Sequence, residues 1–218
     1  MSGLSTQINE SAEKVDKFIE EVVDLESEPQ ILYRAARHII DAGGKKVRPF
    51  LVLKSCKLVG GNIEDALATA SSLELLHTFT LLHDDIMDQD EKRRGVPSVH
   101  AKWGVPIAII AGDLLFAKVY EAITKFTDTK RVKPKQILQV VKEISEVTVV
   151  LCEGQTQDIM FETKETVSEA EYFRMIEGKT AALFKTSARC GGLLGGGTKT
   201  QVKCLGEYGF YAGIAFQV

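Results

Sequence analysis

The sequence has no apolar run long enough to cross a membrane. Its longest apolar stretches, such as residues 106–111, fall far short of the roughly 18–20 residues that a spanning helix requires. The polar residues 1–18 also lack the apolar core of a secretory signal peptide. We therefore expect a cytoplasmic protein without a membrane span.

Cysteine is scarce and forms no paired motif. The four cysteines, Cys56, Cys152, Cys190 and Cys204, include no CxxC pair, and the four histidines form no HExxH motif. A zinc site is therefore not expected, and we predict reduced, mostly buried thiols. The net charge is −3 and the basic cluster at residues 92–94 is short, so we expect no nucleic-acid partner.

Proline is also rare, and its placement predicts helices. The five prolines fall between periodic segments or at their starts. Apolar residues recur with the helical period, and no convincing alternating strand pattern occurs. We predict an all-α fold, a single antiparallel helix bundle of about eight helices, with one domain over residues 1–218. The predicted helices span residues 8–25, 30–42, 48–59, 64–90, 105–126, 134–164, 168–194 and about 200 to the end.

Local signals place several helix ends. Asn62 and Ser168 are predicted N-caps, because their side chains can accept hydrogen bonds from free N–H groups of the first helical turn. The pair Gly43-Gly44 predicts a helix stop, and the glycine run 195–197 predicts a break.

The sharpest chemical feature is the segment LLHDDIMD at residues 81–88. Asp84 and Asp88 are four residues apart and lie on one helix face. Two carboxylates at this spacing suit Mg²⁺, which takes its other ligands from water and substrate phosphate. A solvated helix end would explain two such carboxylates equally well if they stood alone.

Basic segments surround this acidic turn. The paired Arg93 and Arg94 follow it, and guanidinium groups hold phosphate oxygens well. In GGKKVRP, at residues 43–49, a helix break precedes a helix start, so Lys45 and Arg48 lie where an anion is favoured. The spacing of a Walker loop is absent. Each basic turn taken singly is equally typical of a solvated surface.

Two polar patches occur later, within predicted helices. One is GQTQD at residues 154–158, and the other is Gly178-Lys179-Thr180. Lys179 adds a further phosphate donor. Taken alone, both patches are also typical of the polar faces of helices.

Together these segments resemble the trans-isoprenyl diphosphate synthase family, in particular its archaeal-type short-chain farnesyl and geranylgeranyl diphosphate synthases. The matching segments are GGKKVRP, LELLHTFTLLHDDIMDQDEKRRG, GQTQD, EGKTAALF and GIAFQ, in the family's order. The resemblance implies the isoprenoid synthase fold and a Mg²⁺-dependent prenyltransferase. Its implied substrates are isopentenyl diphosphate and an allylic diphosphate (dimethylallyl, geranyl or farnesyl), and a homodimer is expected.

The resemblance also implies residue roles. Asp84, Asp88 and Asp158 would bind the metal, and Asp84, Asp88, Arg93 and Lys179 would be catalytic. The residues implied for substrate binding are Lys45, Arg48, His77, Arg93, Arg94, Gln155, Lys179, Thr180 and Gln217. Leu76, Phe79 and Thr80 would set the product length. A bulky Phe79 would limit the depth of the product tunnel, which favours geranylgeranyl over farnesyl diphosphate.

The sequence departs from the family pattern at its end. The chain stops where the family's second aspartate-rich motif normally begins, so we expect C-terminal helices to be missing and catalysis by this chain alone to be impaired. Three explanations stay open: a truncated or split chain completed by a second chain, a deliberate fragment, and a non-catalytic subunit. A terpene cyclase of the same fold is a further alternative. Lys45, Arg48 and His77 disfavour the cyclase, which needs no pocket for isopentenyl diphosphate.

Overall fold

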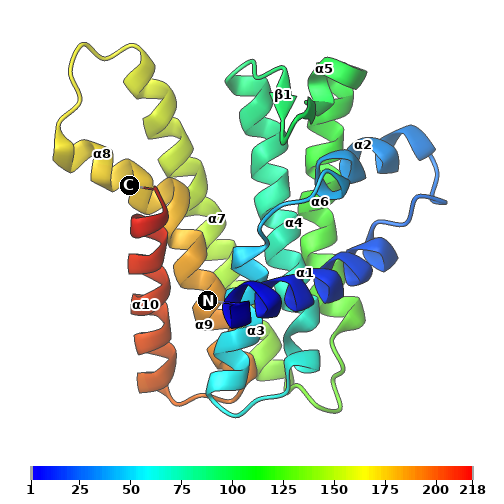
Figure 1. Cartoon of the computed structure of the whole chain (residues 1–218), viewed down its shortest axis with the longest axis vertical. Helices are drawn as coiled ribbons and strands as arrows, with labels where there is room; N and C mark the ends of the chain where they lie inside the picture. Colours follow the sequence, from blue (N-terminus) through cyan, green and yellow to red (C-terminus); the bar gives the residue numbers. More distant parts are fainter. Residues whose placement is uncertain (1, 218) are drawn as a thin grey trace. The chain divides into compact units, whose positions relative to one another are not determined.

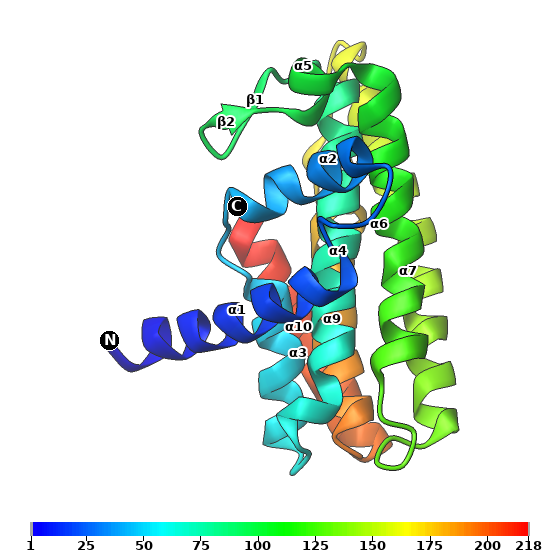
Figure 2. The same cartoon turned by 90° about the vertical axis from the view of Figure 1, so that its right-hand side faces the viewer.

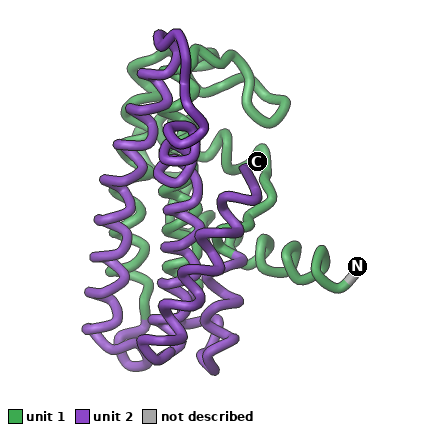
Figure 3. Tube along the Cα trace, turned by 90° about the vertical axis from the view of Figure 1, so that its left-hand side faces the viewer, with its two compact units in different colours: residues 1–49, 67–127 green, residues 50–66, 128–218 purple. Residues whose placement is uncertain are grey.

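The protein is described by a computed structural model that covers residues 2–217. It divides into two compact units, and neither is one continuous stretch of chain. Unit 1 comprises residues 1–49 and 67–127, and unit 2 comprises residues 50–66 and 128–218 (Figure 3). The single domain over residues 1–218 therefore stays a prediction.

Helices dominate the described chain (Figure 1). In order, they are α1 (Ser2–Val22), α2 (Gln30–Asp41), α3 (Val47–Leu58), α4 (Ile63–Met87), α5 (Val99–Trp103), α6 (Val105–Phe126), α7 (Pro134–Glu162), α8 (Glu169–Ile176), the π-helix η1 (Glu177–Ala181), α9 (Ala182–Leu194) and α10 (Lys199–Gln217). The strands β1 (Lys92–Arg93) and β2 (Val96–Pro97) form a short antiparallel ribbon. The all-α prediction is confirmed.

Unit 1 is built on the neighbouring helices α4 and α6. Phe79 of α4 and Phe116 of α6 meet with their ring centroids 5.1 Å apart, and α2 and α5 pack against α6. α1 contributes Val15 and Ile19 to the core, while its N-terminal part extends away from the other helices of the unit (Figure 2). Burying these apolar faces is the main stabilising contribution to such a helical unit.

Unit 2 packs α7, η1, α9 and α10 together, with α10 running beside α9 (Figure 1). α7 and η1 cross at two glycines. A Cβ added at Gly154 would lie 2.4 Å from the backbone nitrogen of Lys179, and one at Gly178 would lie 3.2 Å from the Cα of Gly154. The two backbones approach this closely because neither residue carries a side chain.

The predicted helix ends agree with the structure in most places. Asn62 Oδ1 accepts a hydrogen bond from the Glu64 N–H at 3.1 Å, and Ser168 Oγ accepts one from the Glu171 N–H at 3.3 Å. α2 ends at Asp41, and Gly43 follows with φ of +88°. Three features were not predicted: the ribbon β1–β2, the short helix α5, and the π-helix that interrupts residues 168–194.

The thiols agree only partly with expectation. All four cysteines are free; Cys56 and Cys190 are buried, but Cys152 and Cys204 are exposed. The prediction of mostly buried thiols is therefore wrong for the exposed pair. No helix within residues 2–217 combines the length and the apolar composition that a membrane span requires.

Candidate functional site

The acidic turn closes α4 in unit 1. Asp84 is half-buried, Asp85 is 1% exposed and Asp88 is exposed. The backbone N–H of Asp88 donates to the carbonyl of Asp84 at 2.8 Å. This is the hydrogen bond of an α-helical turn, so the two residues lie one turn apart. Asp84 and Asp88 therefore have the predicted spacing, with a buried third carboxylate between them.

Arg93 pairs with that third carboxylate. Its Nε donates to Asp85 Oδ1 at 2.7 Å, and its Nη2 also pairs with Asp85 and, at 3.1 Å, with Asp90 Oδ2. Burial alone would lower the pKa of Arg93, but these ion pairs and the nearby Asp84 reverse the effect and raise it. For Asp85, burial outweighs the arginine, so the pKa of this carboxyl is raised. Arg93 thus carries a full charge beside the acidic turn.

The acidic turn fits a hard metal ion. The other oxygen of Asp85, Oδ2, is buried and accepts no hydrogen bond from the residues that the structure describes. Within residues 2–217, no group of three or more His, Cys, Asp or Glu side chains gathers as a protein-only metal site. Mg²⁺ needs no such group, because it commonly takes one or two carboxylates and keeps water or phosphate as its other ligands.

Basic side chains gather elsewhere in unit 1, around His77 of α4: Arg48, half-buried at the start of α3, and Arg94, which follows β1. Lys45, two residues before α3, is exposed. Arg94 Nη1 donates to the carbonyl oxygens of Ile39, at 3.0 Å, and of Gly43. Its guanidinium lies so close to the chain at Gly44 that a Cβ there would be 2.9 Å from Cζ.

These cations set the protonation state of His77. Burial, followed by Arg48, Arg94, Lys46 and Arg93, holds the pKa of His77 well below its ordinary value, so its imidazole is neutral near pH 7. Burial also lowers the pKa of Arg48 to about 10, against an opposing effect of Glu74. The pKa of Arg94 falls for the same reasons. Unit 1 therefore holds the partly desolvated guanidinium groups of Arg48 and Arg94 close to the neutral imidazole of His77.

Sequence reasoning missed a buried ion cluster beside these cations. Lys46 Nζ lies 3.1 Å from Asp16 Oδ1 and 3.3 Å from Glu74 Oε1, and the side chains of Lys46 and Glu74 are only 1% and 3% exposed. The available signal was an acidic residue, Glu74, inside the otherwise uncharged run 66–82. A carboxylate in such a run is seldom buried without a cationic partner.

The residues proposed for product length lie on α4, between one and about two turns before Asp84. Leu76 is fully buried, and Thr80 Oγ1 donates to the His77 carbonyl at 2.8 Å. Phe79 stacks on Phe116 and lies 4.7 Å, centroid to centroid, from the ring of His83. Phe79 therefore belongs to an aromatic cluster of α4 and α6.

Unit 2 holds the remaining predicted residues. Lys179 Nζ donates to Asp158 Oδ2 at 2.5 Å, which joins η1 to α7. Thr180 Oγ1 donates to Gln217 Oε1 at 3.1 Å. Gln155 Nε2 is buried and has no hydrogen-bond acceptor among residues 2–217. The structure thus brings these five residues into two polar contacts and one unsatisfied amide.

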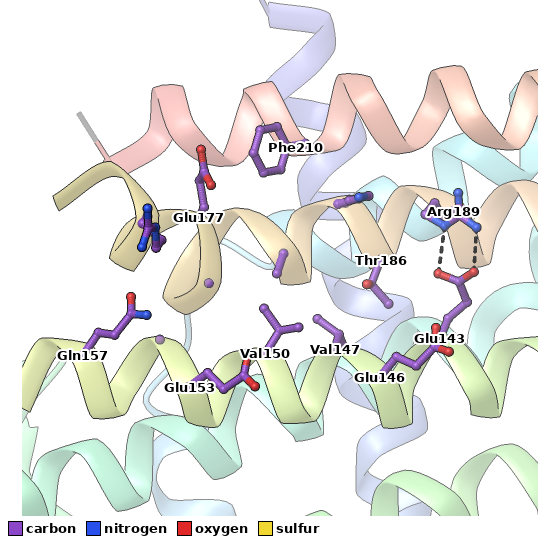
Figure 4. A pocket seen from close by; sticks show the side chains of 15 residues that line it. Glu143, Glu146, Val147, Val150, Glu153, Gln157, Glu177, Thr186, Arg189 and Phe210 are labelled. Carbon is purple, nitrogen blue, oxygen red and sulfur yellow. Dashed lines mark hydrogen bonds and ion pairs between the residues drawn. The ribbon is translucent and has the colours of Figure 1, made fainter. Parts of the chain in front are cut away.

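A cavity of about 460 Å³ also lies in unit 2, between α7, α9 and α10 (Figure 4). Arg189 bridges one side through hydrogen bonds of 2.6 and 2.8 Å to Glu143. Its lining includes acidic and basic side chains together with the apolar Val147, Val150 and Phe210. None of the predicted site residues lines it.

Known proteins resemble the chain over nearly its whole length. It is 41% identical over 215 residues to a geranylgeranyl diphosphate synthase of Methanosarcina mazei, covering 99% of this chain and 65% of that protein. It is 46% identical over 207 residues to a short chain isoprenyl diphosphate synthase of Methanothermobacter thermautotrophicus, covering 95% of this chain and 62% of that protein. The chain thus spans slightly less than two thirds of these relatives.

Solved structures agree. A crystal structure of geranylgeranyl pyrophosphate synthetase from Pyrococcus horikoshii is similar with a TM-score of 0.95 and 46% identity, covering 99% of this chain and 64% of that chain. The isoprenoid synthase fold predicted from the motifs is confirmed. Residues 29–218 also match the family described as Polyprenyl synthetase. This chain belongs to the polyprenyl synthetase family.

Proposed function

We propose that the chain is a trans-prenyltransferase that condenses isopentenyl diphosphate with an allylic diphosphate to give geranylgeranyl or farnesyl diphosphate. The observation that carries the proposal is the arrangement in unit 1, where Arg48 and Arg94 surround a neutral His77 and Arg93 lies beside the carboxylates that end α4. Clustered cations in a partly desolvated site are unfavourable unless an anion joins them. A diphosphate is such an anion.

Lys45, Arg48, His77 and Arg94 bind the diphosphate of the isopentenyl substrate in this proposal. Guanidinium groups grip phosphate oxygens through paired hydrogen bonds, and an ammonium adds a mobile point charge. A neutral His77 donates a hydrogen bond without adding to the repulsion among the cations.

In this proposal Asp84 and Asp88 would hold Mg²⁺ for the allylic diphosphate, and Asp158 is likewise assigned to metal binding. The ion when bound supplies charge neutralisation for a leaving diphosphate. Arg93 and Lys179 add cationic hydrogen-bond donors to the same leaving group. Gln155, Thr180 and Gln217 line the allylic side and orient the substrate.

The chemistry then needs no protein base. The allylic C–O bond breaks heterolytically, and the diphosphate departs with the electron pair. The double bond of isopentenyl diphosphate attacks the resulting carbocation, so that a C–C bond forms. The condensed cation loses a proton to the departing diphosphate, which restores a double bond.

Phe79 limits the length of the growing chain. Its ring, packed on Phe116 beside Leu76 and Thr80, stands one turn from the acidic residues. We therefore expect mainly the C20 product. The proposal also includes Mg²⁺ as cofactor, a cytoplasmic setting and a homodimer. The alternative is a non-catalytic subunit of a prenyl diphosphate synthase, which would need a partner chain for activity.

Transfer of labelled isopentenyl diphosphate tests this function. With farnesyl diphosphate and Mg²⁺, we expect labelled geranylgeranyl diphosphate. Asp84→Asn should lower the rate by roughly two orders of magnitude, the scale typical for loss of a group that stabilises developing charge. Asp24→Asn makes the same charge change in the exposed turn after α1 and should leave the rate unaltered. Incorporation that is equal with and without Mg²⁺, or equal in both variants, would contradict the proposal.

A further inference from the structure

The buried ammonium of Lys46 joins three segments of unit 1. The residue sits between α2 and α3, with φ of +47°, a left-handed conformation that a lysine seldom adopts. Its Nζ reaches Asp16 on α1 at 3.1 Å and Glu74 on α4 at 3.3 Å. The two carboxylates hold the side chain inward, so its charge is fixed where solvent cannot screen it.

The carboxylate of Glu74 interacts electrostatically with more than one cation. It is the buried carboxylate whose charge opposes the burial-induced fall in the pKa of both Arg48 and Arg94. Lys46 makes the ion pair with Glu74, at 3.3 Å, while Arg48 and Arg94 lie within the electrostatic influence of the same buried carboxylate. A guanidinium that donates to a carboxylate has fewer N–H donors for a phosphate. Which cation pairs with Glu74 therefore decides how many guanidinium donors can bind a ligand.

We propose that Lys46 is a positioning residue for the diphosphate-binding cations: by engaging Glu74, it keeps Arg48 and Arg94 directed to the diphosphate of isopentenyl diphosphate. Asp16 places a second carboxylate 3.1 Å from the ammonium of Lys46 and ties α1 to the same cluster. The inference rests on the proposed function, since it assigns a support for that site. Lys46 itself contacts no substrate in this scheme.

Replacing the ammonium tests the proposal. In Lys46→Met, Glu74 loses its close partner and turns to Arg48 or Arg94. We expect the KM for isopentenyl diphosphate and the Kd for inorganic diphosphate, measured by calorimetry, to rise about tenfold, while kcat changes less than about threefold. Lys17→Met removes the same charge from an exposed site on α1 and should leave both constants unchanged.

The double variant Lys46→Met/Glu74→Gln separates positioning from simple structural support. With no buried carboxylate left to capture the arginines, affinity should return to within about threefold of the starting value. A lysine that only stabilised the fold would behave differently: both variants would lose melting temperature, and affinity would not recover.

The outcomes distinguish the inference from the function it rests on. If the unaltered protein binds neither isopentenyl diphosphate nor inorganic diphosphate, the proposed function is wrong and the inference falls with it. If the unaltered protein binds both, but Lys46→Met binds equally well or the double variant is weaker still, the function stands and the positioning role of Lys46 is wrong.

Discussion

At the scale of single residues, charge state is governed by neighbours more than by residue type. His77 is surrounded by cations on α3, on β1 and in the turns beside them, so its imidazole is held neutral. Its pKa in the folded protein therefore lies well below the value of about 6.5 that it has when unfolded. A proton then binds the unfolded chain more readily than the folded one.

This difference predicts how stability depends on pH. Stability contributed by the neutral imidazole is fully present above pH 6.5 or so, and it is lost as the pH falls through about 6.5 towards the folded-state pKa. His77→Gln has no such group. We expect its free energy of unfolding to fall less steeply between about pH 6.5 and 5, by up to ~1.4 kcal/mol per pH unit. Urea denaturation at several pH values measures how the free energy of unfolding changes with pH in the unaltered protein and in His77→Gln. Equal slopes for the two proteins would contradict a neutral His77.

The predicted site residues were found because their spacing carries chemical meaning. Asp84 and Asp88 share a helix face whatever surrounds them, and Arg93 and Arg94 follow at once. Lys46 and Glu74 were missed because polar residues in a sequence are normally taken as surface residues. Only their packing against each other, which periodicity does not encode, makes their burial tolerable.

At the scale of helices, the crossing of α7 and η1 depends on a residue without a side chain. Alanine favours a helix over glycine by about 1 kcal/mol. At Gly154, however, a Cβ would lie 2.4 Å from the backbone nitrogen of Lys179, which cannot rotate away. Overpacking costs about 1–3 kcal/mol, and the gain in helix propensity offsets about 1 kcal/mol of it. Gly154→Ala should therefore lower the free energy of unfolding by up to roughly 2 kcal/mol.

Thr156→Ala provides the matched control for that substitution. It lies on the same helix, is exposed, and gains helix propensity without a close neighbour. We expect it to be neutral or slightly stabilising in the same denaturation experiment. A Gly154→Ala variant that is as stable as Thr156→Ala would show that the two backbones can separate without cost.

Long helices were predicted well, and short or irregular ones were not. The repeating apolar positions and the caps at Asn62 and Ser168 fixed the starts of α4 and α8. α5 is too short for a period to emerge, and the ribbon β1–β2 offers two residues per strand. The π-helix at Glu177–Ala181 was missed because its hydrogen-bond register depends on the crossing with α7, which local sequence does not specify.

At the scale of the whole molecule, the repulsion between Arg48 and Arg94 in unit 1 would be relieved by a bound anion. A ligand that binds only the folded state stabilises it by about 2.7 kcal/mol at a concentration of 100 Kd. For a protein of this size that corresponds to a rise in Tm of roughly 5–10 °C. Isopentenyl diphosphate, bound by side chains alone, should produce this shift in EDTA.

An allylic diphosphate should behave differently, because its site relies on carboxylates that repel it without metal. A non-hydrolysable thiodiphosphate analogue of farnesyl diphosphate should raise Tm with Mg²⁺ and lose that effect in EDTA. Thermal denaturation of the two complexes, each with and without EDTA, makes the comparison. Equal shifts for the analogue in both conditions would exclude a metal-dependent site at Asp84 and Asp88.

The interleaved composition of the units bears on how the protein is made. Residues 50–66 belong to unit 2, yet 61 residues of unit 1, numbers 67–127, follow them before unit 2 resumes. During synthesis, residues 50–66 therefore leave the ribosome well before the remaining residues of unit 2, 128–218, have been made. Residues 50–66 therefore lack their packing partners in residues 128–218 for a time, and contacts so remote in sequence form slowly. We therefore expect residues 50–66 to be most open to non-native contacts while residues 67–127 are being synthesised.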